Sequence, residues 1–438
     1  MKIRFVVSVL GLAMGSIAYG QAVPAGTSMT SSNLGPNLPN LDGVLHYAVS
    51  ASEVVQFGYY GDGVVTHSTA LSGDVAYTAK SVVYPFSALV NAGVLLGNSS
   101  GQGTGYFTSA TVSQGLITRH WNFNVSDSVS ALPQSPTLGL SGIAGTGDLG
   151  SLPVQGPSEG PAGGILSNGG KRVANTLSGG VERMITRNTS LSGGGSWSIL
   201  HFPDNTAGLD SSQVTGEVAL NRRLDARSSV SLSAVYSTFG YKNGNSFNQP
   251  DIETRGLNLS YQRVLTRTLS VSVSAGPQWV SSSNSTLIPS SLNAAASASL
   301  SYQKGLTSAS LSYTRGVNAG SGVLPGALSD SYSGFLGHTF GRKWVASLSA
   351  NYSHTDGLTH QFNGTSPVSV EESFNTVYGG GQVTRSFTSH ISGYASYTVQ
   401  HQASNFSTVV PANATIGTSQ TFGVGVTYSP RSTRLGQF

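Results

Sequence analysis

The sequence predicts an all-β chain: a single transmembrane, antiparallel, up-and-down β-barrel of eighteen strands, with fourteen strands as the lower bound. Three observations predict this fold. Apolar and small polar residues alternate with a period of two, and successive strand side chains point to opposite faces of a sheet. Short links and long polar stretches join the alternating segments in turn. Charged residues make up only 9% of the chain, against about 25% in soluble domains.

The N-terminal residues predict an export signal. Lys2 and Arg4 precede an apolar run at 5–14, and small residues follow it, which predicts a secretory signal peptide over residues 1–22. The alternative is an ordinary buried N-terminal strand. We expect residues 23–43 to form a periplasmic N-terminal segment. No later apolar run approaches the roughly 18 residues of a membrane helix. The chain contains no cysteine, so neither disulfides nor thiolate metal sites are possible.

Residues 44–132 predict five N-terminal barrel strands, at 44–57, 64–77, 82–96, 106–116 and 121–132. Two carboxylates conflict with this interpretation. Glu53 shares its phase with Val55, and Asp127 shares its phase with Val125, so each would lie on the apolar face at a cost that depends on depth. We expect that they lie at the rim, that a bulge changes the phase, or that the region is partly outside the wall. If only one early strand joins the wall, the count falls to fourteen.

A long Gly/Pro/Ser-rich segment, residues 133–172, follows these strands and has almost no strand pattern. Structureless loops of this length are usually functional or disordered. Two arrangements remain open: the segment folds into the barrel and narrows it, or it stays outside the mouth.

Residues 173–429 repeat one β-hairpin. In the copy at 253–280, Leu257, Leu259 and Tyr261 alternate with polar residues, a link at 263–267 follows, and a second alternating limb returns. Comparable links stand at 182–187, 221–227, 303–307, 339–343 and 384–388. Six hairpins, five earlier strands and a last strand at 421–428 make the predicted eighteen, and residues 430–438 form a C-terminal tail.

The links differ in length on the two sides of the predicted sheet. Short turns of outer-membrane barrels face the periplasm and long loops face outside, so we expect both termini in the periplasm. Basic residues such as Arg183 and Arg267 stand at the short links, whereas acidic residues such as Asp204 and Glu371 stand in the long loops. We interpret these charges as solvated turn residues rather than as a binding site.

The polar face predicts the lining of a lumen. A barrel of about 16 to 18 strands is wide enough to hold water, and this lining is mostly small and uncharged, which favours neutral polar solutes or weak selectivity. The candidate lining residues are Asp74, Glu182, Glu217, Ser231, Ser233, Ser270, Ser272, Ser274, Ser299 and Ser310.

The residue pattern favours no enzyme, cofactor or metal. Ser353, His354 and Asp356, with His360 nearby, are the best local candidates, but adjacent strand residues alternate faces and Ser353 and His354 cannot simply converge. The remaining His residues are scattered, without the spacing of metal ligands. The net charge of +4 is small for this length and indicates no nucleic-acid partner.

These features together resemble bacterial outer-membrane β-barrels, including the terminal Phe438 that many of them carry as an assembly signal, although Pro430 interrupts the last alternation. The stretches 121–127, 132–137 and 142–147 look like a segment of uncharacterised acidobacterial barrel proteins. The resemblance implies an outer-membrane location, lipid as surroundings and the barrel-assembly machinery as a partner. We expect a porin-like passive channel for small polar solutes. The alternatives are a closed or plugged barrel serving as a surface scaffold or adhesin, and a secreted β-solenoid or matrix protein; the oligomeric state is left open.

Overall fold

The protein is described by a computed structural model. The signal peptide predicted at 1–22, the N-terminal segment 23–43, most of the segment 133–172 and most of the C-terminal tail lie outside the described residues. The structure describes residues 44–58, 65–79, 81, 83–97, 105–133, 171–203, 209–242, 250–320, 323–341, 343–359, 361–363, 366–368, 373–405, 414, 416–430 and 433–434.

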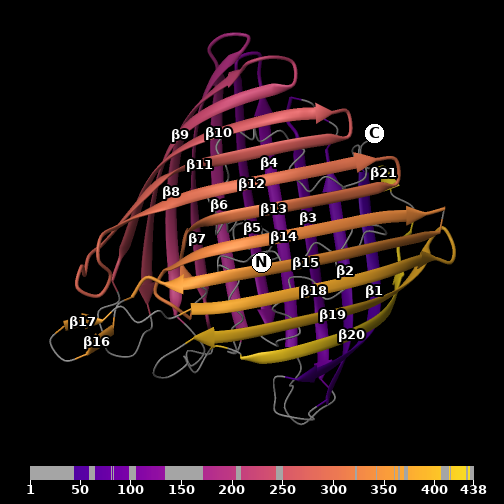
Figure 1. Cartoon of the computed structure of the whole chain (residues 1–438). Helices are drawn as coiled ribbons and strands as arrows, with labels where there is room; N and C mark the ends of the chain where they lie inside the picture. Colours follow the sequence, from indigo (N-terminus) through magenta and orange to yellow (C-terminus); the bar gives the residue numbers. More distant parts are fainter. Residues whose placement is uncertain are drawn as a thin grey trace, which may run out of the picture.

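Eighteen long antiparallel strands form one closed wall, so the predicted fold class and strand count are confirmed (Figure 1). Within the described residues, no helix is both long and apolar enough to cross a bilayer. The strands of the wall are β1 (Val44–Gly58), β2 (Val65–Thr78), β3 (Phe86–Gly97), β4 (Gly105–Ile117), β5 (Trp121–Pro133), β6 (Lys171–Met184), β7 (Thr189–His201), β8 (Asp210–Arg223), β9 (Ser228–Lys242), β10 (Ile252–Thr266), β11 (Leu269–Ser282), β12 (Ser291–Lys304), β13 (Thr307–Asn318), β14 (Ala327–Phe340), β15 (Trp344–Gly357), β18 (Ser373–Ser386), β19 (Ile391–Asn405) and β20 (Gly417–Tyr428).

The wall closes where the first strand meets the last. β1 pairs with β20 in one register, from Val49 opposite Tyr428 to Gly58 opposite Ser419, and each other strand pairs with its neighbours in the chain. Between β15 and β18 a separate small hairpin forms from β16 (Gln361–Asn363) and β17 (Ser366–Val368), and β21 (Thr433–Arg434) adds to β1. Closure leaves no unpaired edge along the wall, which removes the usual template for aggregation.

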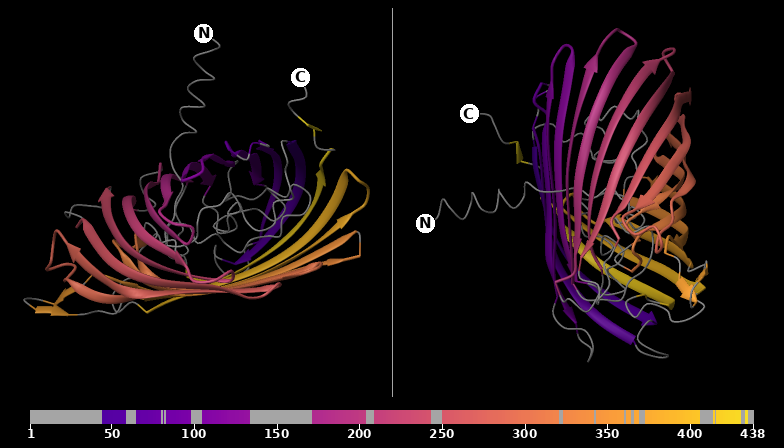
Figure 2. Two further views of the ribbon diagram at one scale, coloured as in Figure 1. Left: turned by 90° about the horizontal axis from the view of Figure 1, so that it is seen from above. Right: turned by 90° about the vertical axis from the view of Figure 1, so that its left-hand side faces the viewer.

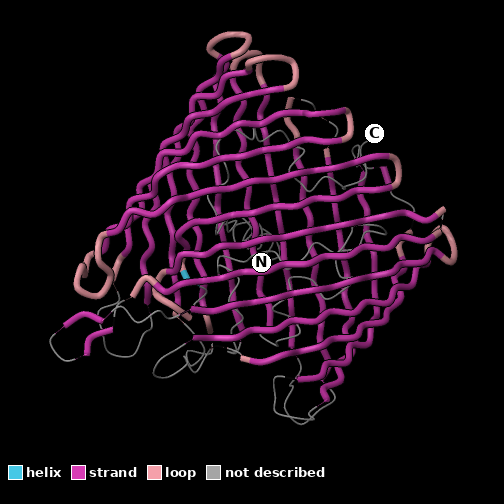
Figure 3. Tube along the Cα trace, viewed as in Figure 1, coloured by secondary structure: helices cyan, strands magenta, loops and turns pink. Residues whose placement is uncertain are grey.

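The alternation in the sequence becomes the two faces of this wall. On β10, Leu259 points outward and is 59% exposed, whereas the next residue, Ser260, points inward and is 6% exposed. Strands of the near wall cross those of the far wall steeply in Figure 1, as the tilt of barrel strands requires. Figure 2 shows the two walls facing each other across one interior. Figure 3 shows that the strands run almost without interruption between the two ends.

The length difference between the links is confirmed. Links such as 185–188, 267–268 and 305–306 join strands at one end, whereas 243–251 and 358–372 join them at the other. We call these ends the short-link end and the loop end. Val44 of β1 lies opposite Arg434 of β21, so the first and last described residues both lie at the short-link end.

The link between β8 and β9 shows how a short turn is held. The Asp225 carboxylate accepts hydrogen bonds from the Ser228 hydroxyl, at 2.6 Å, and from the N–H groups of Arg227 and Ser228. These bonds, that of the Ser228 hydroxyl first, lower the pKa of Asp225. Because the folded-state pKa is depressed, this stabilisation is present above the ordinary pKa of aspartate and is lost as the pH falls through the folded pKa.

The expectations for the two carboxylates of the early strands need correction. The register of β1 runs unbroken against β2 and β20 on both sides of Glu53, and the register of β5 is equally unbroken around Asp127. Neither a bulge nor a departure from the wall therefore explains them. Both lie well inside their strands rather than at a rim, on the outer face, where Asp127 is only 5% exposed. The lower count of fourteen strands is wrong for the same reason.

Candidate functional site

The inner face of the barrel has two chemically different zones. Near the loop end, buried apolar side chains from many strands and three loops form what we call the apolar collar. The rest of the inner face carries mainly Ser, Thr, Asn and Gln side chains. The apolar collar consists of Val54, Ala70, Leu95, Phe107, Leu200, Phe202, Phe239, Tyr241, Ile252, Val280, Ile288, Ala319, Val323, Leu324, Ala327 and Phe374.

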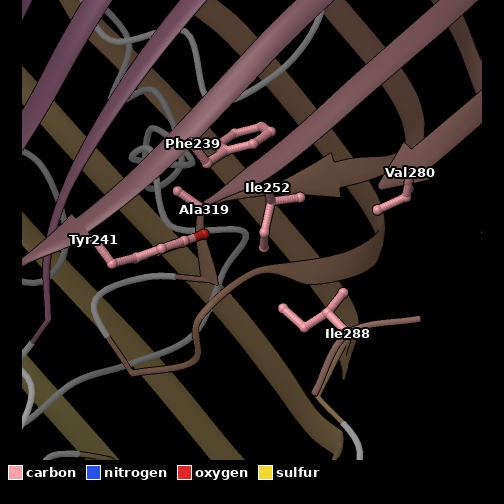
Figure 4. Packing of buried hydrophobic residues seen from close by; sticks show 6 residues of the cluster. All are labelled: Phe239, Tyr241, Ile252, Val280, Ile288 and Ala319. Atoms are coloured by element: carbon pink, nitrogen blue, oxygen red, sulfur yellow. The ribbon is translucent and has the colours of Figure 1, made fainter. Parts of the chain in front are cut away.

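Strand phase turns the wall residues of the collar inward. Phe239 and Tyr241 share the phase of buried Ser237 on β9, and Ile252 shares the phase of buried Thr254 on β10. Ile252 is 0% exposed, because Phe239 and Tyr241 from the neighbouring strand and residues from two loops pack around it (Figure 4). The collar therefore consists of four packed apolar clusters, of which the one around Ile252 is closed to water.

The loop between β13 and β14 turns into the barrel mouth. The N–H groups of Val323 and Leu324 donate to the Gly320 carbonyl, and the Asn318 side chain accepts from the Gly320 N–H at 2.8 Å. This tight turn places Leu324 and Val323 against Phe374 of β18, on the inner face. Gly326, at φ +81°, ends the turn beside Ile252, where an added Cβ would lie 2.4 Å from the Ile252 Cδ1. Only glycine fits this close approach without a shift of its neighbours.

A second turn, between β11 and β12, delivers Ile288 to the collar. The Asn284 carbonyl accepts from the Ile288 N–H at 3.0 Å, and the Asn284 side chain accepts from the Thr286 hydroxyl at 2.6 Å. Figure 4 shows Ile288 on the same side of the wall as Ile252 and Val280. Local hydrogen bonds thus position apolar side chains that the strands themselves could not supply.

Below the collar, hydroxyl and amide groups bond across strands. Because small inward side chains stand directly opposite each other in the register, most of these bonds join neighbouring strands. The pairs include Ser50 with Ser72, Ser87 with Ser113, Ser126 with Ser178, Thr215 with Ser237, Ser274 with Ser297, Ser312 with Ser333 and Thr376 with Gln402.

One inner-face network links an acid to a predicted lining serine. The Ser190 hydroxyl donates to Glu182 at 2.6 Å, and the Asn221 amide donates to Ser190 at 3.5 Å and to Ser192 at 3.0 Å. The Ser231 hydroxyl donates to the Asn221 side-chain oxygen at 2.7 Å. Asn221, which the sequence did not single out, therefore connects β7, β8 and β9. The arrangement fixes Glu182 with a hydrogen bond while leaving it half-buried.

All ten predicted lining residues lie on the inward phase of their strands, but they differ in access to water. Ser299 and Ser310 are exposed, and Ser270, Ser272, Glu182 and Glu217 are half-buried. Ser231, Ser233 and Ser274 are buried. Asp74 is 0% exposed and accepts a hydrogen bond from Asn91, so its carboxylate is enclosed within the inner face. The register brings Ser299 opposite Ser272 on one side and Ser312 on the other, and it brings Ser310 opposite Ser301.

The candidate triad does not assemble. Ser353 is buried on the inner face, whereas His354 is on the outward phase, with its Nε2 3.1 Å from the Asp356 Oδ1 and its Nδ1 2.8 Å from the Asn375 side-chain oxygen. His360 lies outside the described residues. In the part of the chain that the structure describes, no group of three His, Cys, Asp or Glu side chains is placed to hold a metal ion.

The apolar collar was missed in the sequence, although a signal for it exists. Adjacent apolar residues place one side chain on each face of a strand, so such a pair marks a position where the inner face is apolar too. Leu95 with Leu96, Tyr106 with Phe107, and Trp279 with Val280 are pairs of this kind at the loop ends of their strands. No comparable signal predicts which loops turn inward.

No protein-family model matches the chain, and no curated protein matches it. Among solved structures it is similar to Pseudomonas aeruginosa OccK2 (OpdF) in complex with glucuronate, at 12% sequence identity, with 88% of this chain and 97% of that chain covered and a TM-score of 0.41. It is also similar to the Pseudomonas aeruginosa outer membrane protein OpdK, at 9% identity, 89% and 99% coverage and a TM-score of 0.43. The siderophore receptor PirA from Acinetobacter baumannii matches at 8% identity, 88% and 80% coverage and a TM-score of 0.41. Similarities of this size carry neither activity nor substrate over to this chain.

Proposed function

We propose that the protein is a porin-like passive channel for small polar solutes in the bacterial outer membrane. One observation carries the proposal: a closed wall of eighteen strands has exposed Leu, Val and aromatic side chains outside and hydroxyl and amide side chains inside. A wall of this size encloses a lumen wide enough for water. The apolar outer face suits lipid, because every backbone group along a closed barrel is already hydrogen-bonded.

The remaining expectations follow from that location. The short-link end, where β1 begins and β21 lies, is proposed to face the periplasm, with the loop end outside. Outer-membrane lipid surrounds the apolar outer face of the wall, which we call the belt, and the barrel-assembly machinery inserts the chain. We also propose that the chain is related to the uncharacterised acidobacterial barrel proteins that it resembles. The predicted signal peptide at 1–22 supports export to this compartment.

The ten predicted lining residues are proposed to contact the permeating solute where water reaches them. Exposed Ser299 and Ser310 and half-buried Ser270 and Ser272 offer hydroxyl groups to a hydrated solute. Glu182 and Glu217 add negative charge to the inner face. We therefore propose passage of neutral polar solutes with a weak preference for cations over anions.

The deciding experiment is reconstitution of the folded protein into planar lipid bilayers. A channel gives discrete conductance steps when the protein inserts, and vesicles containing it swell in isotonic solutions of small polar solutes. The proposed function is overturned if folded and inserted protein gives neither steps nor swelling, both as the wild type and with the apolar collar made polar.

Removing the two acids is expected to change ion selectivity without closing the channel. In the double variant Glu182→Gln and Glu217→Gln, the cation preference falls about twofold for each charge, since a unit charge about 8 Å from an ion in water contributes about 0.5 kcal/mol. Reversal potentials in a salt gradient measure this ratio. Glu253→Gln, on the outer face at the loop end, is the matched control and leaves the ratio unchanged. An unchanged ratio in the double variant would contradict the lining role of both acids.

One observation favours a second candidate function, a closed barrel serving as a surface scaffold or adhesin. The apolar collar is packed, with Ile252, Ala327 and Phe374 at 0% exposure. The segment 133–172, which would plug the mouth in this alternative, lies outside the described residues except for its ends. A scaffold stays non-conducting even after the collar is made polar, whereas a channel with a closed resting state opens, so the collar variants described in the Discussion separate the two.

A further inference from the structure

The outer face of the barrel is not uniform around its circumference. Between the aromatic residues near its two ends, the outer face of β7 to β20 carries mainly apolar side chains and glycine, for example Leu259, Leu311, Leu348 and Val424; His338, beside Phe340 at the short-link end, is polar. The outer face of β1 to β6 carries several polar side chains at similar heights. We call these the polar sector, which consists of Glu53, Thr69, Thr108, Asp127 and Asn175.

Glu53 lies deep within the belt. A strand rises about 3.4 Å per residue and is tilted by about 45° to the barrel axis. Along that axis, the Glu53 Cα is therefore about 10 Å from Phe57 and about 14 Å from Tyr47, the aromatic residues at either end of β1. A charged side chain facing lipid at such a depth destabilises a barrel. Thr69 donates one hydrogen bond to the Glu53 Oε2, at 2.7 Å. A carboxylate accepts about four hydrogen bonds, so one hydroxyl leaves most of its capacity for a further donor.

The register shows which donors share the level of Glu53. Directly paired residues form rows that run from strand to strand around the wall. Because the strands are tilted, each row rises toward the loop end by about 3 Å per strand. The row that starts at Leu45, at the short-link end of β1, for example, reaches Glu253, at the loop end of β10. Correcting for this climb, Thr108 of β4 lies within about 1 Å of the height of Glu53, and Asn175 of β6 within about 3 Å. The Thr108 hydroxyl already donates its one hydrogen to the Asn91 carbonyl, at 3.2 Å, so the donor at this level is the Asn175 amide.

Small residues between these positions allow another protein surface to approach closely. Gly73 and Ala92 face each other on the outer faces of β2 and β3, and Ala110 and Gly179 follow on β4 and β6. Close approach of small residues and hydrogen bonds between polar side chains are the main forces that join protein surfaces within a bilayer. The polar sector offers both on one side of the barrel only.

We infer that the polar sector binds a second copy of this chain, in a head-to-tail contact in which β1–β2 of one copy faces β4–β6 of the next. At a common depth, Glu53 of one copy accepts a hydrogen bond from the Asn175 amide of the other. This complementarity lies within a single chain, so the chain can serve as its own partner. The inference rests on the proposed membrane location, but it does not depend on conductance.

Cysteine cross-linking in lipid vesicles tests the contact, since the chain contains no cysteine of its own. The double variant Thr69→Cys and Asn175→Cys is expected to form covalent dimers and larger species on mild oxidation. Each single variant is expected to stay monomeric, because a head-to-tail contact places different residues opposite each other. The control pair, Leu311→Cys and Leu348→Cys on the apolar side, is expected to give no cross-link. Absence of cross-links in the first pair, or equal cross-linking of the control pair, would overturn the inference.

A second variant distinguishes assembly from simple exposure to lipid. Glu53→Leu removes the acceptor, and we expect about threefold weaker association of folded copies, because one hydrogen bond between protein surfaces within a bilayer contributes about 0.6 kcal/mol. Light scattering of the detergent-solubilised protein measures the mass. Val424→Leu, opposite Glu53 on β20, is the matched control. If the solubilised wild-type protein has the mass of a single copy, or if Glu53→Leu leaves an assembly intact, the contact does not exist. Conductance in bilayers tests the proposed channel separately, so failure of the contact and failure of the channel can be told apart.

Discussion

Replacing Ile288 and Leu324 by serine is expected to raise the time-averaged conductance of the reconstituted protein by at least about tenfold. Both side chains come from loops and pack into the apolar collar. Burying each one contributes about 2 kcal/mol, and about 1.4 kcal/mol corresponds to a factor of ten in an equilibrium. Serine is also expected to let water in among the packed apolar side chains, because hydrophobic constrictions gate pores by excluding water. Single-channel recording of wild-type and variant protein measures the change.

The substitution has a matched control at the other end of the barrel. Leu306 is exposed in the link between β12 and β13, far from the collar, and Leu306→Ser is expected to leave conductance unchanged. Because the loop residues are outside the wall, the barrel of the double variant should keep its β circular dichroism signal. A folded double variant with wild-type conductance would show that the collar is not the barrier, and one without any conductance would favour the scaffold.

Placing arginine at Leu259 is expected to lower the free energy of unfolding from lipid vesicles by about 2–4 kcal/mol, the cost of a cationic side chain near the middle of an outer-membrane belt. Leu259 is on the outer face of β10, between Leu257 and Tyr261. Leu265 is on the same strand but close to the short link, beside Arg263 and Arg267. Leu265→Arg is therefore expected to cost only about 0–1 kcal/mol. Urea unfolding in vesicles, followed by tryptophan fluorescence, measures both.

The difference between the two arginine variants is the informative quantity. In a bilayer the cost depends on depth, because water and head groups solvate the cation near the interface. In water, both positions are exposed surface, and each substitution would change the free energy of unfolding by less than about 0.5 kcal/mol. Equal and small effects at Leu259 and Leu265 would mean that the outer face does not contact lipid.

The wall was predictable from the sequence because a strand's two faces are set by a local period of two. Leu257, Leu259 and Tyr261 point outward and Ser270, Ser272 and Ser274 inward on the strands where the alternation predicts them. The site was predictable only in part. The lining serines lie on the inner face, but Asp74 is enclosed beside Asn91, and Glu182 belongs to a network through Ser190 and Asn221 that spans four strands. Those contacts depend on which residues the register places opposite each other.

By itself the sequence determined the strands, their number, their two faces and the unequal links, because alternation and turn composition act between residues close together in the chain. Only the tertiary structure decided that Val49 lies opposite Tyr428 to close the wall and that the loop holding Leu324 turns inward. It also decided that Glu53 shares a height with Thr108 and Asn175. Closure, loop direction and relative height all depend on tilt and register summed around the barrel, and no short stretch of sequence contains that sum.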